Sequence, residues 1–141
     1  MKNLISNKLL FVVMRVMLGF IFIWAFLDKT FGLGFATKPE NSWISGGSPT
    51  TGFLTHAVQG PFADFFHLLA GSSVVDWMFM LGLLFVGVTL LAKRFVRWGA
   101  LVGSLMLLLM YLAVLFPENN PIIDDHLVYI VALFLIAKNS D

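Results

Sequence analysis

The chain has 141 residues, of which 59% are hydrophobic and 12% are charged. A soluble domain carries about twice that share of charged residues, so the composition excludes an ordinary soluble protein and indicates an integral membrane protein. The net charge of +1, with basic residues scattered along the chain, excludes a nucleic-acid-binding protein, and the absence of cysteine excludes disulfides, thiolate metal sites and cysteine-bound iron–sulfur clusters within this chain.

Four apolar stretches predict four membrane-spanning helices. We therefore expect an all-α fold, a polytopic membrane four-helix bundle that forms a single transmembrane domain over residues 1–141. A spanning helix needs about 20 residues, which the first three stretches supply and the fourth does not quite reach. The first stretch lacks a small-residue cleavage site after it, so it is interpreted as a retained helix and not as a signal peptide. The predicted helices cover about residues 9–27, 74–92, 98–116 and 122–137.

The first predicted helix carries a charged residue, Arg15, inside its apolar run. A charge at membrane depth costs roughly 2.5–3.5 kcal/mol, and no acidic residue of the sequence is expected at the depth of Arg15. Its side chain either extends to the lipid phosphates of the inner leaflet or binds an oxygen-bearing group between helices, a backbone carbonyl or a ligand. Helical spacing places Arg15 and Lys29 on the same face of this helix.

The connection between the first and second predicted helices is too long for a simple turn, so we expect it to contain structure. Ser48 predicts an N-cap and Pro49 the first position of a short helix. The Gly60-Pro61 pair ends that helix and opens a second one. Over about residues 48–71 we therefore expect two short interfacial helices in a long outer loop, above the mouth of the bundle. A lid that merely seals the bundle is the alternative interpretation.

The third predicted helix contains a Gly-x-x-x-Gly pattern at Gly99 and Gly103. Small residues at this spacing let the backbone of a neighbouring helix approach closely, so the pattern predicts helix packing and not catalysis.

The distribution of charge predicts the orientation of the bundle. If the helices alternate in direction, most basic residues fall on one side, which the positive-inside rule places in the cytoplasm. Both termini are therefore expected to be cytoplasmic and the protein to be a multi-pass protein of the plasma membrane. The basic residues on this side are Lys2, Lys8, Lys93, Arg94, Arg97 and Lys138. The outer side carries Lys29 and Lys38 with the acidic residues Asp28, Glu40, Asp64, Asp76, Glu118, Asp124 and Asp125.

The fourth predicted helix needs extra residues at its start to approach the ~30 Å thickness of the hydrocarbon layer. Asn120 is a good N-cap and Pro121 suits the first helical position, so the helix is predicted to begin there. Its first turns would then contain adjacent carboxylates, Asp124 and Asp125, which favour the positive end of the helix dipole. Capping alone explains such carboxylates, and the pattern leaves open which of the two faces the bundle.

The same turns can also be interpreted as a site of proton transfer. Asp125 and His126 lie four and three residues before Tyr129, so the three side chains can share one patch on the helix. A carboxylate, an imidazole and a phenol close together can move protons. Lys29 is predicted at the same depth, and we expect it to pair with Asp125 or its neighbour Asp124, with Asp28 as a competing partner.

Three segments of the chain resemble the DoxX/DoxD family of small four-helix membrane proteins. The resemblance covers nearly the whole chain, and it implies a membrane subunit of an oxidoreductase. DoxD is the membrane subunit of a thiosulfate:quinone oxidoreductase whose partner is the separate subunit DoxA, and other relatives are associated with thiol redox balance. This chain contains no evident DoxA-like region. The similar segments are Arg15, Gly19 and Asp28-Lys29, then the Gly-Ser-Pro-Thr run at residues 47–50, then residues 120–129.

The resemblance and the polar residues together predict a quinone-interacting subunit that oxidises thiosulfate or a thiol donor at the outer face. The expected catalytic residues are Asp125, His126, Tyr129 and Lys29, and the expected quinone-binding residues are Arg15, Lys29 and Tyr129. We expect no haem, flavin or metal in this chain, because it has no dinucleotide fingerprint and all three histidines are predicted on the outer side. Besides the lipid bilayer, the expected partner is a DoxA-like or other redox subunit.

Two other functions are consistent with the same residues. The first is a non-catalytic membrane protein that recruits partners of a redox or stress-response complex through its acidic outer surface. The second is a carrier for a small anion or a proton, although no inverted repeat is evident. The sequence leaves open whether the chain forms a homo-oligomer.

Overall fold

The computed structural model describes residues 6–140, and within that range the chain is helical, with no strand. Two short 3₁₀ helices lie in the connection after the first helix. In chain order the elements are α1 (Asn7–Phe31), η1 (Pro39–Asn41), η2 (Trp43–Ser45), α2 (Thr51–His56), α3 (Ala63–His67), α4 (Ser73–Leu91), α5 (Val96–Ala113) and α6 (Asp125–Lys138).

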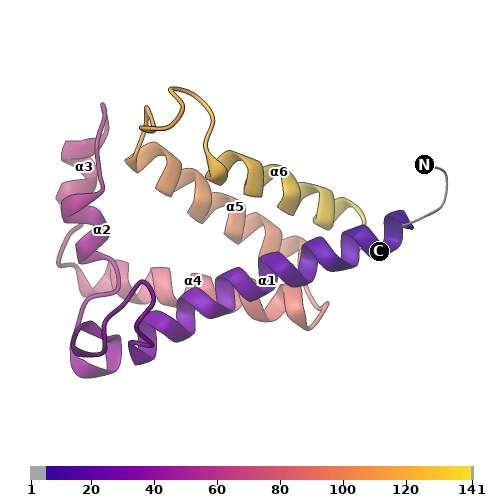
Figure 1. The fold of residues 1–141 in the computed structure, drawn as a ribbon, viewed down its shortest axis with the longest axis horizontal. Helices are drawn as coiled ribbons and strands as arrows, with labels where there is room; N and C mark the ends of the chain where they lie inside the picture. Colours follow the sequence, from indigo (N-terminus) through magenta and orange to yellow (C-terminus); the bar gives the residue numbers. More distant parts are fainter. Residues whose placement is uncertain (1–5, 141) are drawn as a thin grey trace.

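The four longest helices share one hydrophobic core. α1 packs along α4, α4 along α5 and α5 along α6, whereas α1 and α6 contact each other over a shorter stretch. In Figure 1, α1 and α6 approach each other toward the chain termini and separate toward α2 and α3. The buried core residues are Leu18 and Phe22 of α1, Met80, Leu83, Val86 and Leu90 of α4, Val96, Ala100 and Leu107 of α5, and Leu133 and Ile136 of α6.

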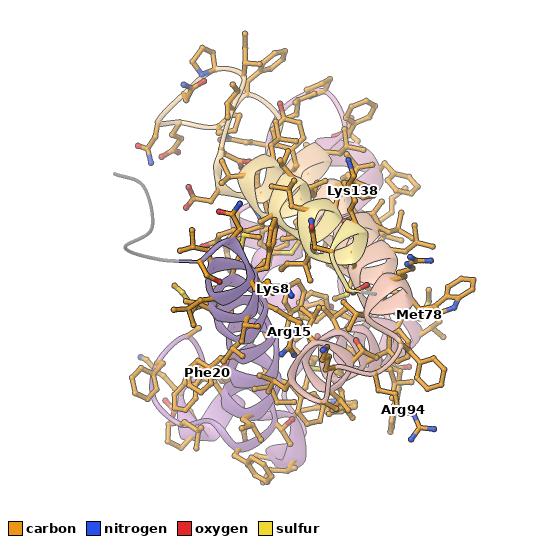
Figure 2. The ribbon with its side chains drawn as sticks, turned by 90° about the vertical axis from the view of Figure 1, so that its right-hand side faces the viewer. Lys8, Arg15, Phe20, Met78, Arg94 and Lys138 are labelled. Atoms are coloured by element: carbon orange, nitrogen blue, oxygen red, sulfur yellow. The ribbon has the colours of Figure 1, made fainter. Side chains whose placement is uncertain are left out.

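Three helices of the described range, α1, α4 and α5, are long and apolar enough to cross a membrane. α6 is apolar as well but has 14 residues, a length of about 21 Å. Large apolar side chains cover the outward faces, as Phe20 and Met78 illustrate in Figure 2, with exposed fractions of 55% and 70%. Such surfaces are stable in lipid, and the membrane class predicted from composition is consistent with them.

The start of the fourth long helix differs from the prediction. α6 begins at Asp125 with Asp124 as its N-cap, and not at Pro121 with Asn120 as N-cap. The side-chain oxygen of Asn120 accepts hydrogen bonds from the backbone N–H groups of Ile122 and Ile123, both at 2.9 Å. Asn120 therefore stabilises a local turn that competes with the helix, which is a common alternative for this residue type.

The two short helices expected between residues 48 and 71 are confirmed as α2 and α3. α2 begins at Thr51 and not at Pro49, although the Ser48 hydroxyl does accept a hydrogen bond from the Thr51 backbone N–H at 3.1 Å. The two helices pack against the start of α4 and the end of α5 through a second, smaller core. The buried members of this core are Leu54, Val58, Phe66 and Ala113.

Glycines lie where the long helices approach most closely. A Cβ atom on Gly99 would lie 2.0 Å from the Thr89 hydroxyl oxygen of α4, and one on Gly103 would lie 3.0 Å from Leu133 of α6. A Cβ on Gly87 would lie 2.9 Å from the backbone nitrogen of Ile23 in α1. The packing role predicted for the Gly-x-x-x-Gly pattern is therefore confirmed.

Charge separates the two ends of the molecule. The basic end, which Figure 2 views directly, carries the basic residues of the first half of α1, of the α4–α5 turn, of the start of α5 and of the end of α6. The loop end contains residues 32–72 and 114–124. The predicted cytoplasmic residue Lys2 lies outside the described residues. The residues that define the basic end are Lys8, Arg15, Lys93, Arg94, Arg97 and Lys138.

Candidate functional site

Arg15 binds backbone carbonyls of a neighbouring helix. Its Nη1 donates hydrogen bonds to the carbonyl oxygens of Leu90 and Leu91, the latter at 3.4 Å. These are the last two residues of α4, where carbonyl groups have no partner inside the helix and carry the negative end of the helix dipole. Of the interpretations that the sequence left open, the structure shows the carbonyl contact. Arg15 therefore connects α1 to the end of α4.

The position of these carbonyls also shows where Arg15 lies along the length of the helices. Lys93 and Arg94 follow only two and three residues after Leu91, in the turn that leads to α5. The guanidinium group therefore lies near the end of the helices and not at their middle. A charge at this level costs much less than one in the centre of the hydrocarbon layer.

Lys29 lies in the last turn of α1 and faces α4. Its Nζ is 5.9 Å from the ring centroid of Phe79, a cation–π contact. Within residues 6–140 it forms no salt bridge, so the expected pair with Asp124 or Asp125 is not formed. The reason is visible in Figure 1, where the end of α1 and the start of α6 lie well apart.

Asp28, the neighbour of Lys29, is a structural residue. Only 2% of its surface is exposed, and its carboxylate accepts hydrogen bonds from the backbone N–H groups of Ala36 and Thr37 at 2.9 Å and of Phe35 at 3.3 Å. The chain can reverse direction after α1 because Gly32 adopts φ +65°, a conformation that favours glycine. Asp28 thereby folds the start of the first connection back onto the end of α1.

A second buried carboxylate, Asp76 of α4, holds the Gly-Ser-Pro-Thr segment. It accepts hydrogen bonds from the hydroxyl groups of Ser48 at 2.7 Å and Thr50 at 2.6 Å. The Thr51 hydroxyl donates to Ser48 and accepts from the Gly71 backbone N–H. This chain of hydrogen bonds joins the two ends of the α2–α3 segment to the first turn of α4. Asp76 was predicted only as one of the acidic residues of the outer side, although a carboxylate at the start of an apolar helix is a visible signal.

A cavity of about 650 Å³ lies between these two anchored segments. We call it the Lys29 cavity. Its available donors are the ammonium groups of Lys29 and Lys38, the Thr37 hydroxyl and the Asn41 amide, because the hydroxyls of Ser48 and Thr51 already donate to Asp76 and Ser48. No acidic residue lines the cavity. Such a set of donors suits an anion. The lining residues are Lys29, Ala36, Thr37, Lys38, Asn41, Gly47, Ser48, Pro49, Thr51, Gly52 and Phe53.

At the start of α6, the carboxylate that contacts His126 is that of Asp124 and not that of Asp125. Asp124 caps the helix by accepting from the His126 backbone N–H at 3.0 Å, and its other oxygen lies 2.7 Å from His126 Nδ1. Asp125 is exposed to solvent. Tyr129 packs against the core, and its hydroxyl group has no hydrogen-bond partner within residues 6–140. The His126 ring is therefore oriented by Asp124, and Tyr129 retains a free donor.

The predicted site residues thus belong to three separate places. Arg15 lies toward the basic end, Lys29 lines the cavity at the end of α1, and the pair of Asp124 and His126 is at the start of α6. Among residues 6–140, no cluster of acidic or histidine side chains has the arrangement of a metal site. No family model, curated protein or solved structure matches the chain.

The Asp76 contacts give a first prediction. Replacing Asp76 with alanine leaves the Ser48 and Thr50 hydroxyl groups without their acceptor, which costs about 1–3 kcal/mol for a buried polar group. We expect a loss of about 2 kcal/mol in the free energy of unfolding and faster proteolysis of residues 46–52. The matched control is Asp64→Ala, which removes an exposed carboxylate. Equal protease sensitivity in the two variants would contradict the anchoring role of Asp76.

Proposed function

We propose that this chain is the quinone-interacting membrane subunit of an oxidoreductase that takes electrons from a small anion bound in the Lys29 cavity. The observation that carries the proposal is the composition of that cavity, which presents Lys29 and Lys38 without a lining carboxylate. Thiosulfate is the donor implied by the resemblance to the DoxX/DoxD family, and a thiol-containing anion is the related choice.

The proposed topology follows from charge. The basic end would face the cytoplasm and the loop end the outside of the plasma membrane, in keeping with the positive-inside rule. α6 would be the fourth membrane crossing, shortened by the local turn at Asn120. The donor would then reach the Lys29 cavity from the outer aqueous phase.

Neither of the two buried carboxylates lines the cavity, so a bound anion would not meet a carboxylate directly. The oxygens of Asp28 accept from backbone N–H groups and Oδ1 of Asp76 accepts from Ser48 and Thr50, although the negative charge of Asp28 still acts on its neighbour Lys29. Within residues 6–140 Lys29 forms no salt bridge, so its ammonium group can donate to a ligand, and hydrogen bonds to charged groups contribute about 1.5–3 kcal/mol each.

In the proposed reaction, thiosulfate is the electron donor and a quinone is the electron acceptor. Two thiosulfate ions each lose one electron and join through a new sulfur–sulfur bond to give tetrathionate. The quinone gains these two electrons and two protons to become the quinol. A redox partner of the DoxA type would complete the path for electrons between the two substrates.

The α6 patch is the proposed site of the quinone head group. The free hydroxyl of Tyr129 can donate a hydrogen bond to a quinone carbonyl, and His126 with Asp124 can deliver protons. Arg15 precedes Lys29 by 14 residues, about 21 Å along α1, so one head group cannot contact both. We therefore assign Lys29 to the binding of the electron-donating anion, and Arg15 to the connection between α1 and α4.

The test is thiosulfate-dependent reduction of a soluble quinone by the purified protein, alone and with its co-purifying partner. We expect Lys29→Gln to raise KM for thiosulfate about tenfold, because one charge-assisted hydrogen bond is lost. Tyr129→Phe should raise KM for the quinone and leave KM for thiosulfate unchanged. The matched control is Lys93→Gln, a lysine of the basic end.

No reduction by either preparation would overturn the oxidoreductase proposal. If the same protein still retained its partner through the loop end, the non-catalytic recruiting function would be the better account. An unchanged KM for thiosulfate in Lys29→Gln would reject the Lys29 cavity as the donor site while leaving quinone reduction intact.

A further inference from the structure

The basic end carries positively charged side chains that have no role in the proposed reaction. Within residues 6–140, every acidic side chain lies toward the other end of the molecule, from Asp28 through Asp125. Five residues of the basic end form no salt bridge with another residue of the described range: Lys8, Arg15, Lys93, Arg94 and Lys138. A surface of this kind attracts anions.

Arg15 has hydrogen-bond donors that its contacts with α4 do not occupy. A guanidinium group has five N–H donors, and the contacts to Leu90 and Leu91 involve only Nη1. Within residues 6–140, Nε and Nη2 of Arg15 have no hydrogen-bond partner, and the side chain is only partly buried. A planar pair of donors in this state matches two oxygens of a phosphate group.

Lys8 extends the same surface. It lies seven residues before Arg15, two helical turns or about 10.5 Å along α1, and therefore on the same face. Figure 2 shows both side chains on the side of α1 that faces the other helices. α4 ends at the level of Arg15, so the first two turns of α1 extend beyond it and leave Lys8 exposed.

The face between the two cations is apolar. Val12 lies four residues after Lys8 and three before Arg15, with 46% of its surface exposed, and Val16 continues the exposed line at 43%. A free phosphate ion would gain no binding energy from an apolar surface, whereas the acyl chains of a phospholipid would pack against it. The combination of cations and exposed valines indicates a lipid.

We propose that Lys8 and Arg15 form a binding site for the phosphate of an anionic glycerophospholipid, whose acyl chains lie along Val12 and Val16. A zwitterionic lipid carries its own compensating cation, so it gains less from this surface. The lipid would complete the hydrogen bonds of Arg15 and thereby reinforce the connection of α1 to α4. This inference does not depend on the redox proposal.

The experiment is a thermal-shift titration of the full chain in detergent with dioleoyl-phosphatidylglycerol, with dioleoyl-phosphatidylcholine and with inorganic phosphate as separate arms. We expect phosphatidylglycerol to raise Tm more than the other two at equal concentration. Lys8→Gln should weaken its apparent affinity about fivefold, because one cation near a lipid surface is lost. The matched control is Arg94→Gln in the α4–α5 turn, an exposed cation that Figure 2 shows on the far side of the basic end from Lys8, and it should leave this affinity nearly unchanged.

Lys8→Gln is the deciding variant because it leaves the contacts of Arg15 to α4 in place, whereas Arg15→Gln removes them as well. Equal shifts with phosphatidylglycerol and phosphatidylcholine would overturn the proposal. An equal shift with inorganic phosphate that Lys8→Gln also weakens would overturn it too, since it would show an ion site without a lipid, separate from the Lys29 cavity. A loss of affinity in Arg94→Gln as large as that in Lys8→Gln would overturn the site as well, since it would show an effect of general charge.

Discussion

Replacing Asp28 with alanine is expected to lower the free energy of unfolding by about 3 kcal/mol or more. The carboxylate accepts hydrogen bonds from three consecutive backbone N–H groups, those of residues 35–37, and it is 2% exposed. Each buried donor left without a partner costs about 1–3 kcal/mol, although water entering the altered loop would offset part of the sum. The measurement is reversible unfolding of the purified protein in mixed detergent micelles.

Asp28→Asn and an exposed carboxylate provide the controls. Asparagine keeps one side-chain oxygen as an acceptor, so its effect should fall between those of the wild type and alanine. Glu40→Gln changes an exposed carboxylate in the same connection and should alter the free energy of unfolding by less than about 0.5 kcal/mol. If Asp28→Ala matched Glu40→Gln, the loop would not depend on these hydrogen bonds. Loss of thiosulfate binding in Asp28→Ala is a further expectation, because the loop contributes Thr37 and Lys38 to the Lys29 cavity.

The second large effect is expected from Gly99→Ala in α5. The added Cβ would lie 2.0 Å from the hydroxyl oxygen of Thr89, far inside van der Waals contact. Thr89 cannot easily move away, because it is 5% exposed and its hydroxyl donates to the Phe85 carbonyl at 2.8 Å. Overpacking of this kind costs about 1–3 kcal/mol, and we expect a value near the upper end. The assay is the same micellar unfolding measurement.

A double variant makes this prediction specific. Thr89→Ala removes the atom that the new Cβ would meet, so Gly99→Ala combined with Thr89→Ala should recover at least half of the lost stability. Gly52→Ala is the matched glycine control, because no atom lies within 4 Å of its added Cβ and its φ is not positive. Additive losses in the double variant would show that α4 and α5 do not meet at this pair.

The overall fold was largely predictable because its signals are local. Apolar runs of helical length predict the long helices, and the observed bounds of α1, α4 and α5 differ from the predicted ones by one to four residues. The Gly-x-x-x-Gly spacing predicts close packing, and a Pro- and Gly-punctuated connection predicts short helices. Each of these patterns depends on residues within a few turns of one another.

The error at α6 has a local cause as well. Asn120 is favoured both as an N-cap and as the first residue of a turn, and spacing alone does not separate these roles. The structure shows the turn, and Asp124 then caps the helix. One consequence is that Asp124, and not Asp125, contacts His126.

By itself, the sequence determined that this protein is a helical membrane protein with a basic end and an acidic one, because composition and helical periodicity follow from neighbouring residues. The tertiary structure decided the partners of its charged groups. Arg15 contacts Leu90 and Leu91 from 75 and 76 residues away, and Asp76 binds hydroxyl groups 26 and 28 residues away. A charged side chain can satisfy its hydrogen bonds with any backbone or hydroxyl group brought near it. Its partner therefore depends on how the helices and loops pack, which no local pattern encodes.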